Sequence, residues 1–465
     1  MTAYSAHSQP PQSARLVNVT EMIDRNGISP FQVLIVVLCF LIVAIDGFDT
    51  AAIGFIAPAI RAQWQLSPAE LAPALGAGLA GLMAGALLFG PIADRIGRKR
   101  MLLLCVFGFG IASVASAFST SLTMLVVLRF LTGMGLGAAM PNAITLTSEY
   151  CPAARRSFLV TTMFCGFTVG SALGGFAAAA LIEHYGWHSV LLAGGVVPLL
   201  LLPVLARFLP ESVRYLAAAG RPAPEITAIL QRIAPHEDFT GASFVTSHGK
   251  AAGSPIARLF RPDLLRGTVL LWFTFFMSLL VIYLLSSWLP MLLRSTGVSL
   301  QTAALVTAMF QVGGTIGAIV LGWLMDRINP HYVLAISYAL AGVFTAAIGT
   351  LTATPWLAAL AVFGAGFCVS GSQVGANALS AAFYPTDCRA TGVSWANGIG
   401  RIGSVVGSLS GGAMLAAGMS MPALFLVVGV PAVFAGMSML ALGVFGGHGK
   451  QADDAAGFAE TESAR

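Results

Sequence analysis

Residues 31–58 read FQVLIVVLCFLIVAIDGFDTAAIGFIAP, an apolar run that contains two aspartates, Asp46 and Asp49. At about 1.5 Å of rise per residue, a helix of this length crosses a hydrocarbon layer roughly 30 Å thick. A carboxylate near the middle of such a helix costs roughly 2.5–3.5 kcal/mol on insertion scales, so it must face a polar cavity or a partner. The two acids are three residues apart and lie on one helix face. They are predicted to form a functional site that handles a proton.

The composition of the whole chain indicates an integral membrane protein with many spans. Apolar residues make up 57% of the 465 residues, charged residues only 9%, and the mean hydropathy is +0.84. A soluble domain carries about 25% charged residues. The apolar runs are continuous and do not alternate, which excludes a β-barrel. The composition therefore predicts an all-α membrane protein.

The charge and the cysteines exclude two other classes of site. The net charge of +5 comes from short basic clusters between apolar runs, so no basic domain for nucleic acid is present. The six cysteines show no CxxC spacing and fall mostly in predicted spans, so we expect neither a disulfide framework nor a metal site.

Twelve transmembrane helices are predicted, six on each side of a central polar stretch. We expect a tail at 1–30 without regular structure, a first bundle at 31–208, a central loop at 209–265, a second bundle at 266–445 and a tail at 446–465. The predicted spans are 31–58, 69–92, 101–119, 122–148, 157–181, 188–208, 266–293, 299–324, 331–351, 355–380, 390–416 and 421–445.

The distribution of Lys and Arg predicts the orientation. Of 24 such residues, Arg129 and Arg401 lie inside spans, and Arg61 and Arg294 lie at the predicted outer ends. All the others fall on the side of the termini. The positive-inside rule therefore predicts that both termini are cytoplasmic.

An internal repeat supports the division into halves. The pattern GxxxDRI occurs at residues 90–96 and again at 322–328, each time after the second span of its half. Duplicated halves are typical of secondary transporters, which bind their substrates near the membrane midplane between the repeats.

The chain resembles the major facilitator superfamily in three places. These are GPIADRIGRKR at 90–100, RFLTGMGLG at 129–137 and PESVRYL at 210–216. Within that superfamily, DGFDTAAIGFIAP at 46–58 and GAAMPNAITLTSEY at 137–150 resemble the aromatic acid:proton symporters. The resemblance implies the major facilitator fold and import of a small benzoate-type or hydroxybenzoate-type acid across a bacterial inner membrane. We expect a monomer with a proton as coupling ion and no cofactor.

The loop motif and the helix ends beside it are candidates for conformational gating. Gly90 and Gly97 permit tight turns. Asp94 can cap a helix, or it can accept a hydrogen bond from an arginine in one transport state and lose it in the other. The alternative for the basic residues is that they only fix the orientation of the helices in the membrane. The resemblance extends the candidate gating group to Arg95, Arg98, Glu149, Asp326, Arg327, His331 and Arg389.

The resemblance also implies that helices 1, 4, 7 and 10 line a central cavity. Arg129 lies roughly 10 Å from the outer end of helix 4, and Asp46 lies roughly 22 Å from the inner end of helix 1. An Asp46–Arg129 pair is therefore feasible, either for coupling or as a static ion pair. Arg401 can bind a carboxylate in bidentate fashion, or it can snorkel or pair with a neighbouring helix.

Further side chains could line the cavity. Trp272, Phe276 and Tyr283 share one helix face and offer a flat wall for an aromatic ring, although such a stripe is often lipid-facing or core. The intramembrane amides could bond a ring hydroxyl or hold helices together. They are Gln311, Gln373, Asn377 and Asn397.

The direction of coupling follows from an absence. Residues 161–175 lack the Gly-Pro pair of the drug antiporters that the family contains, which favours symport. A sugar or other organic-solute facilitator and a transporter-like membrane receptor stay open as alternatives. The sequence offers no set of nucleophile and base that would indicate an enzyme. The identity of the acid, the proton stoichiometry and the titrating aspartate are left open.

Overall fold

The computed structural model describes residues 15–239, 241–245, 255–352, 354–384 and 388–463 of the chain. Within them, twelve spans are long and apolar enough to cross a membrane. Two of them are interrupted, so that α5 and α6 form one span, and α15, the π-helical segment η2 and α16 form another. The spanning elements are α2 (Pro30–Trp64), α3 (Pro68–Ile96), α4 (Arg98–Ala117), α5 (Leu122–Gly137), α6 (Ala139–Tyr150), α7 (Arg156–Tyr185), α8 (His188–Phe208), α12 (Pro262–Ser295), α13 (Leu300–Met325), α14 (Pro330–Leu351), α15 (Pro355–Ala365), η2 (Gly366–Ser370), α16 (Gly371–Phe383), α17 (Arg389–Ala416) and α18 (Met421–Ser463).

Several of these helices begin at a capping sequence. Ser29 and Ser67 cap α2 and α3, and in both cases a proline follows and the residue at the third helical position closes a capping box. The α3–α4 turn is made by Gly97, whose φ of +99° favours glycine.

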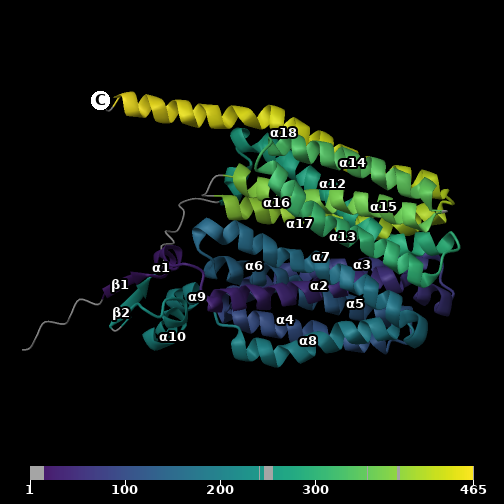
Figure 1. Ribbon diagram of the computed structural model, residues 1–465, viewed down its shortest axis with the longest axis horizontal. Helices are drawn as coiled ribbons and strands as arrows, with labels where there is room; N and C mark the ends of the chain where they lie inside the picture. Colours follow the sequence, from purple (N-terminus) through teal and green to yellow (C-terminus); the bar gives the residue numbers. More distant parts are fainter. Residues whose placement is uncertain (1–14, 240, 246–254, 353, 385–387, 464–465) are drawn as a thin grey trace, which may run out of the picture.

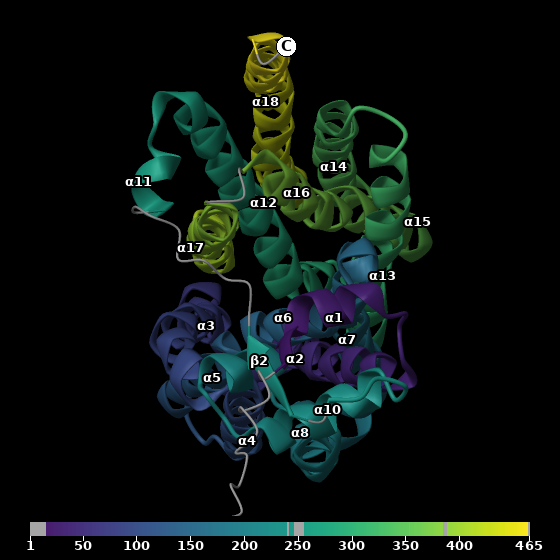
Figure 2. The same cartoon turned by 90° about the vertical axis from the view of Figure 1, so that its left-hand side faces the viewer.

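The helices form two bundles, drawn one above the other in Figure 1, with the N-terminal half below. Each half packs in the same way. Its first span lies against its fifth (α2 on α7, α12 on α17), and its third lies against its sixth (α4 on α8, α14 on α18). Figure 2 shows the same two groups of helices seen end-on. The shared packing pattern matches the repeat at 90–96 and 322–328.

Close backbone approach holds the first span against the fifth in each half. A Cβ added to Gly170 of α7 would lie 1.7 Å from the carbonyl oxygen of Ala44 in α2. In the other half, a Cβ on Gly403 or Gly407 of α17 would lie 2.2 Å from a carbonyl oxygen of α12. The glycines spaced four residues apart in α17 therefore serve helix packing.

One end of the bundle carries a small additional layer, and we name it the terminal end (Figure 1). It consists of a parallel two-stranded sheet of β1 (Arg15–Asn18) and β2 (Ala242–Val245) and of short helices. These helices are α1 (Val19–Arg25), η1 (Ala153–Arg155), α9 (Val213–Ala218), α10 (Ala223–Ile233) and α11 (Pro255–Leu259). The opposite end is the far end.

This layer corrects two expectations. The segment before residue 30 is not without regular structure, because residues 15–25 form β1 and α1, and Val19, Met22 and Ile23 are buried. The stretch at 209–265, which was expected only as a polar loop, supplies α9, α10 and β2. Both segments contain short apolar stretches that bury each other, which a pattern of long spans does not reveal.

The two halves meet through three pairs of helices: α7 against α13, α3 against α17 and α2 against α12. Thr315 of α13 donates to Thr168 of α7 at 2.6 Å near the middle of the bundle. Toward the far end, a Cβ on Gly412 of α17 would lie 2.9 Å from the Cβ of Ala72 in α3. The halves are therefore joined at mid-height and at the far end.

Candidate functional site

A buried ion pair lies inside the N-terminal half, between Asp49 of α2 and Arg129 of α5. The Asp49 side chain is 1% exposed and that of Arg129 is 3% exposed. Ser113 of α4 donates to the other oxygen of Asp49 at 2.9 Å. Both oxygens of this carboxylate are thus held by neighbouring helices.

This geometry corrects the feasible Asp46–Arg129 pair, because the structure pairs Arg129 with Asp49. The two aspartates differ in depth by three residues, about 4.5 Å along the helix. That difference is smaller than the uncertainty of helix ends read from sequence. The two acids lie on one helix face, but Arg129 pairs with Asp49, which is the acid nearer the far end.

Asp46 has a different environment although it lies one turn away. Thr50 donates to its Oδ1 at 3.2 Å, whereas its Oδ2 has no hydrogen-bond partner among the described residues. Its charge interacts with that of Arg401 in the C-terminal half. A buried carboxylate oxygen without a partner is unfavourable, so this atom is suited to carry a proton or to meet a ligand.

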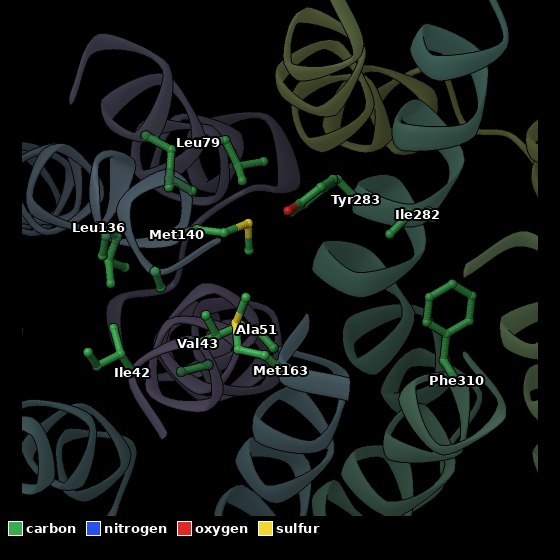
Figure 3. Packing of buried hydrophobic residues seen from close by; sticks show 14 of the residues in the cluster. Ile42, Val43, Ala51, Leu79, Leu136, Met140, Met163, Ile282, Tyr283 and Phe310 are labelled. Carbon is green, nitrogen blue, oxygen red and sulfur yellow. The ribbon is translucent and has the colours of Figure 1, made fainter. Parts of the chain in front are cut away.

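Arg401 lies at the boundary between the two halves. Its Nη1 donates to the hydroxyl of Tyr283 at 3.0 Å, and its Nη2 lies 3.9 Å from the sulfur of Met140 in the N-terminal half. Figure 3 shows the Tyr283 hydroxyl pointing across this boundary toward Met140. No carboxylate of the described residues forms a salt bridge with Arg401. The guanidinium is therefore available to an anion.

A cavity of about 20 Å³ adjoins the ion pair, lined by Asp49, Thr50 and Arg129 together with apolar side chains of α2, α3 and α5. A cavity must have a free volume of roughly 10–15 Å³ to hold one water molecule. Thr50 lines it and also donates to Asp46. The two aspartates are thus connected through Thr50 and a space the size of a water.

The predicted aromatic wall is only partly assembled. Trp272 stacks on Trp395 of α17 with a centroid distance of 5.7 Å, toward the terminal end of the bundle. Tyr283 lies beside Arg401, and Phe276 is partly buried against Gly403. Trp395 was not predicted as a site residue, and its place in the same helix as Arg401 is the signal that could have identified it.

The four amides fall into two groups. Gln311 donates to Ser286 at 3.3 Å, and Asn397 donates to Asn377 at 3.2 Å, so these three have partners. Gln373 is 7% exposed, and neither its Oε1 nor its Nε2 has a partner among the described residues.

Three candidate gating residues of the N-terminal half, Gly97, Arg98 and Glu149, lie around Glu211, which the sequence did not single out. The Glu211 carboxylate accepts from the backbone N–H groups of Arg98 at 2.7 Å and Lys99 at 3.1 Å, and so caps α4. Glu149 accepts a hydrogen bond from the Ser212 hydroxyl. The motif PESVRYL, which contains both Glu211 and Ser212, was the available signal.

The same motif braces the loop before α4 and supplies a half-buried cation, Arg214. Tyr215 donates to the carbonyl of Arg95 at 2.7 Å, and a Cβ on Gly97 would meet the Glu211 carboxylate. Burial lowers the pKa of Arg214, and the nearby Glu149 carboxylate opposes that shift.

The corresponding residues of the C-terminal half are less enclosed. Asp326 is exposed, and Arg327 lies over the Trp323 ring at 4.1 Å. His331 is half-buried, and its Nδ1 has no partner among the described residues. The side chains of Asp94 and Arg389, and the surroundings of Gly90, lie outside the described part of the structure.

A family model described as Major Facilitator Superfamily matches residues 39–294 and 271–462. The chain belongs to the major facilitator superfamily. It is a multi-pass membrane protein of a transporter family, which confirms the predicted fold class and the expectation that it is not an enzyme.

Curated relatives refine this assignment. A gallate transporter of Pseudomonas putida is 50% identical and covers 94% of this chain and 97% of its own length. The 4-hydroxybenzoate transporter PcaK of Pseudomonas putida is 48% identical over 92% of this chain and 96% of its own length. This major facilitator therefore belongs to the family of aromatic acid transporters, as its motifs predict.

Among solved structures, the inward open conformation of the xylose transporter XylE from E. coli is similar in fold. Its TM-score is 0.69 at 19% identity, over 88% of this chain and 95% of that chain. At this identity the likeness concerns the fold alone.

Proposed function

We propose that this protein imports a small aromatic carboxylate of the hydroxybenzoate or benzoate type together with a proton, by alternating access. The observation that carries the proposal is the placement of Arg401, a guanidinium at the boundary of the halves that has no carboxylate within salt-bridge distance in the described structure. A planar guanidinium binds a carboxylate through two parallel hydrogen bonds. The names of the relatives support an aromatic acid as the anion.

The proton site is proposed to be Asp46. Protonation of Asp49 would leave the buried Arg129 without its counter-charge, which is strongly unfavourable. Asp46 has an oxygen without a partner and shares its electrostatic environment with Arg401. A proton on Asp46 neutralises this acid as the substrate carboxylate neutralises Arg401. The loaded transporter then has no uncompensated charge at the boundary when the halves move.

Further points belong to this proposal. The membrane is the bacterial inner membrane, and both termini are cytoplasmic, so the terminal end of the bundle is the inner end. The protein acts as a monomer. It needs no cofactor besides the coupling proton. The gating group around Glu149 and Arg98 closes the inner end when the binding site is open to the outside.

Uptake into proteoliposomes tests the proposal. Purified protein is reconstituted, and accumulation of radiolabelled 4-hydroxybenzoate and gallate is measured under an imposed inward proton gradient, with and without a protonophore. We expect accumulation of at least one acid, and its loss with the protonophore. Radiolabelled xylose is tested in parallel, because accumulation of the sugar and of neither acid would favour the sugar-facilitator alternative. Binding without any flux would favour a receptor.

Two substitutions test the assigned roles. We expect Asp46→Asn to abolish gradient-driven accumulation while exchange of labelled for unlabelled acid persists, since exchange moves no net proton. We expect Arg401→Lys to raise KM at least about tenfold, because lysine keeps the charge but loses the planar fork. Arg294→Lys at the far end is the matched control and leaves KM unchanged. Full accumulation by Asp46→Asn would overturn the proton assignment.

A further inference from the structure

Gln373 is a buried amide without a partner. Its side chain is 7% exposed, and both its oxygen and its nitrogen lack hydrogen bonds among the described residues. A buried polar group left without a hydrogen bond is unfavourable. An amide that only held helices together would have a partner in the neighbouring helix, as Asn377 has in Asn397. Gln373 therefore requires a partner that is not part of the polypeptide in this structure.

The register of two helices places Gln373 at the level of Arg401. The spans of α16 and α17 follow each other in the chain and run in opposite directions across the bundle. The Asn397–Asn377 hydrogen bond fixes their register. Gln373 is one turn beyond Asn377 toward the far end, and Arg401 is one turn beyond Asn397 in the same direction. Each step is about 6 Å, so the unpartnered amide and the guanidinium lie at the same depth.

The packing of α16 fixes which face carries the amide. A Cβ on Gly371 would lie 2.7 Å from the backbone of Gly317 in α13, and one on Gly375 would lie 2.8 Å from the sulfur of Met325. Gln373 lies two residues from each, which is about 200° around the helix. Its side chain is therefore on the face opposite α13. The π-helical segment η2 ends three residues before it, and such segments are frequent at functional sites.

The chemistry of the amide indicates its ligand. A carboxylate only accepts hydrogen bonds, and Arg401 supplies donors for it. An amide offers one acceptor and two donor hydrogens, and a phenolic hydroxyl both donates and accepts. The two unpartnered atoms of Gln373 thus match a ring hydroxyl and would not both be used by a carboxylate. Such a group at the depth of Arg401 lies within reach of one ligand held by both.

We infer that Gln373 is a specificity-determining residue that hydrogen-bonds a ring hydroxyl of the substrate while Arg401 binds its carboxylate. This inference rests on the proposed function. A site that bonds a hydroxyl rejects the analogue that lacks it, because the polar group of the site is then left unpaired. The wild-type protein should consequently prefer hydroxylated benzoates to benzoate itself.

The test is the ratio of two binding constants. Binding of 4-hydroxybenzoate, 3,4-dihydroxybenzoate and benzoate to the purified full-length protein is measured by titration calorimetry. We expect the wild-type protein to bind the better hydroxylated acid at least about tenfold more tightly than benzoate. In Gln373→Leu this ratio should fall to within about twofold of one, with benzoate bound as well as before or better. Gln373→Asn should lie between the two.

Controls separate the possible failures. Ser372→Ala removes a neighbouring buried hydroxyl that likewise has no partner in the described part of the chain, and the preference for hydroxylated acids should persist in this variant. An equal loss of affinity for all three acids in Gln373→Leu would show that the amide binds the carboxylate or supports the fold, and would overturn the inference. If the wild-type protein binds none of the acids, the proposed function itself has failed. If it binds them without preferring a hydroxyl, the inference alone has failed.

Discussion

The same substitution should affect stability strongly at Asp49 and hardly at all at Asp46. Asp49→Asn leaves Arg129, whose side chain is 3% exposed, as a buried cation without its counter-charge. Breaking a buried ion pair from one side typically costs 3–5 kcal/mol. Asp46→Asn removes a carboxylate with an unpartnered oxygen and keeps a group that can accept from Thr50. We therefore expect no loss of stability, or a small gain, at this position.

Thermal unfolding of the purified variants measures the difference. For a cooperative unit of 150–250 residues, about the size of the N-terminal bundle, 1 kcal/mol shifts Tm by roughly 2–4 °C. Asp49→Asn should therefore lower Tm by at least about 6 °C, whereas Asp46→Asn should change it by less than about 2 °C.

The double variant Asp49→Asn/Arg129→Gln removes both charges and completes a mutant cycle. Its Tm should recover most of the loss, because no isolated charge then stays buried, and the coupling between the two sites should be on the order of 3 kcal/mol. The reasoning is refuted if Asp46→Asn destabilises as much as Asp49→Asn, or if the double variant is no more stable than the single one.

Two further predictions concern packing and capping. Gly170→Val should abolish the yield of monodisperse protein in size-exclusion chromatography, because its Cβ would lie 1.7 Å from the Ala44 carbonyl oxygen. Gly108→Val is the control and should be tolerated, since no described atom lies within 4 Å of a Cβ at that position. Equal yields of the two variants would contradict the packing. Glu211→Gln should cost about 1 kcal/mol, measured as a lower Tm, since a charged cap on two amides of α4 becomes neutral. Glu225→Gln on the exposed first turn of α10 is the control, and an equal loss there would refute the capping role.

The fold could be predicted because its signals repeat along the chain. Each span is a long apolar run, and the GxxxDRI pattern marks the duplication. The spacing of Gly403 and Gly407 predicts a packing face, and both glycines lie against carbonyl oxygens of α12. Such signals depend on local periodicity, which does not require knowledge of helix tilt.

The site could be predicted in composition but not in pairing. The buried charges were recognisable as exceptions in apolar runs, yet choosing between Asp46 and Asp49 required depth to within one turn. The fourth span is broken at Ala138, between α5 and α6, and the first continues to Trp64. Both features alter depths counted from assumed ends. The role of Glu211 depends on a contact between residues more than one hundred positions apart, which no spacing shows.

Two adjacent acids on one helix face can divide the requirements of coupled transport between them. An acid that must release and rebind a proton needs an environment in which neither state is strongly preferred. A carboxylate such as Asp49, with both oxygens hydrogen-bonded and a buried arginine as partner, does not have that environment. The buried Arg129 needs a permanent counter-charge, and Asp49 supplies it with help from Ser113. Asp46 is then free to respond to Arg401 and to the substrate carboxylate. Thr50, which donates to Asp46 and lines the cavity beside the ion pair, connects the two roles.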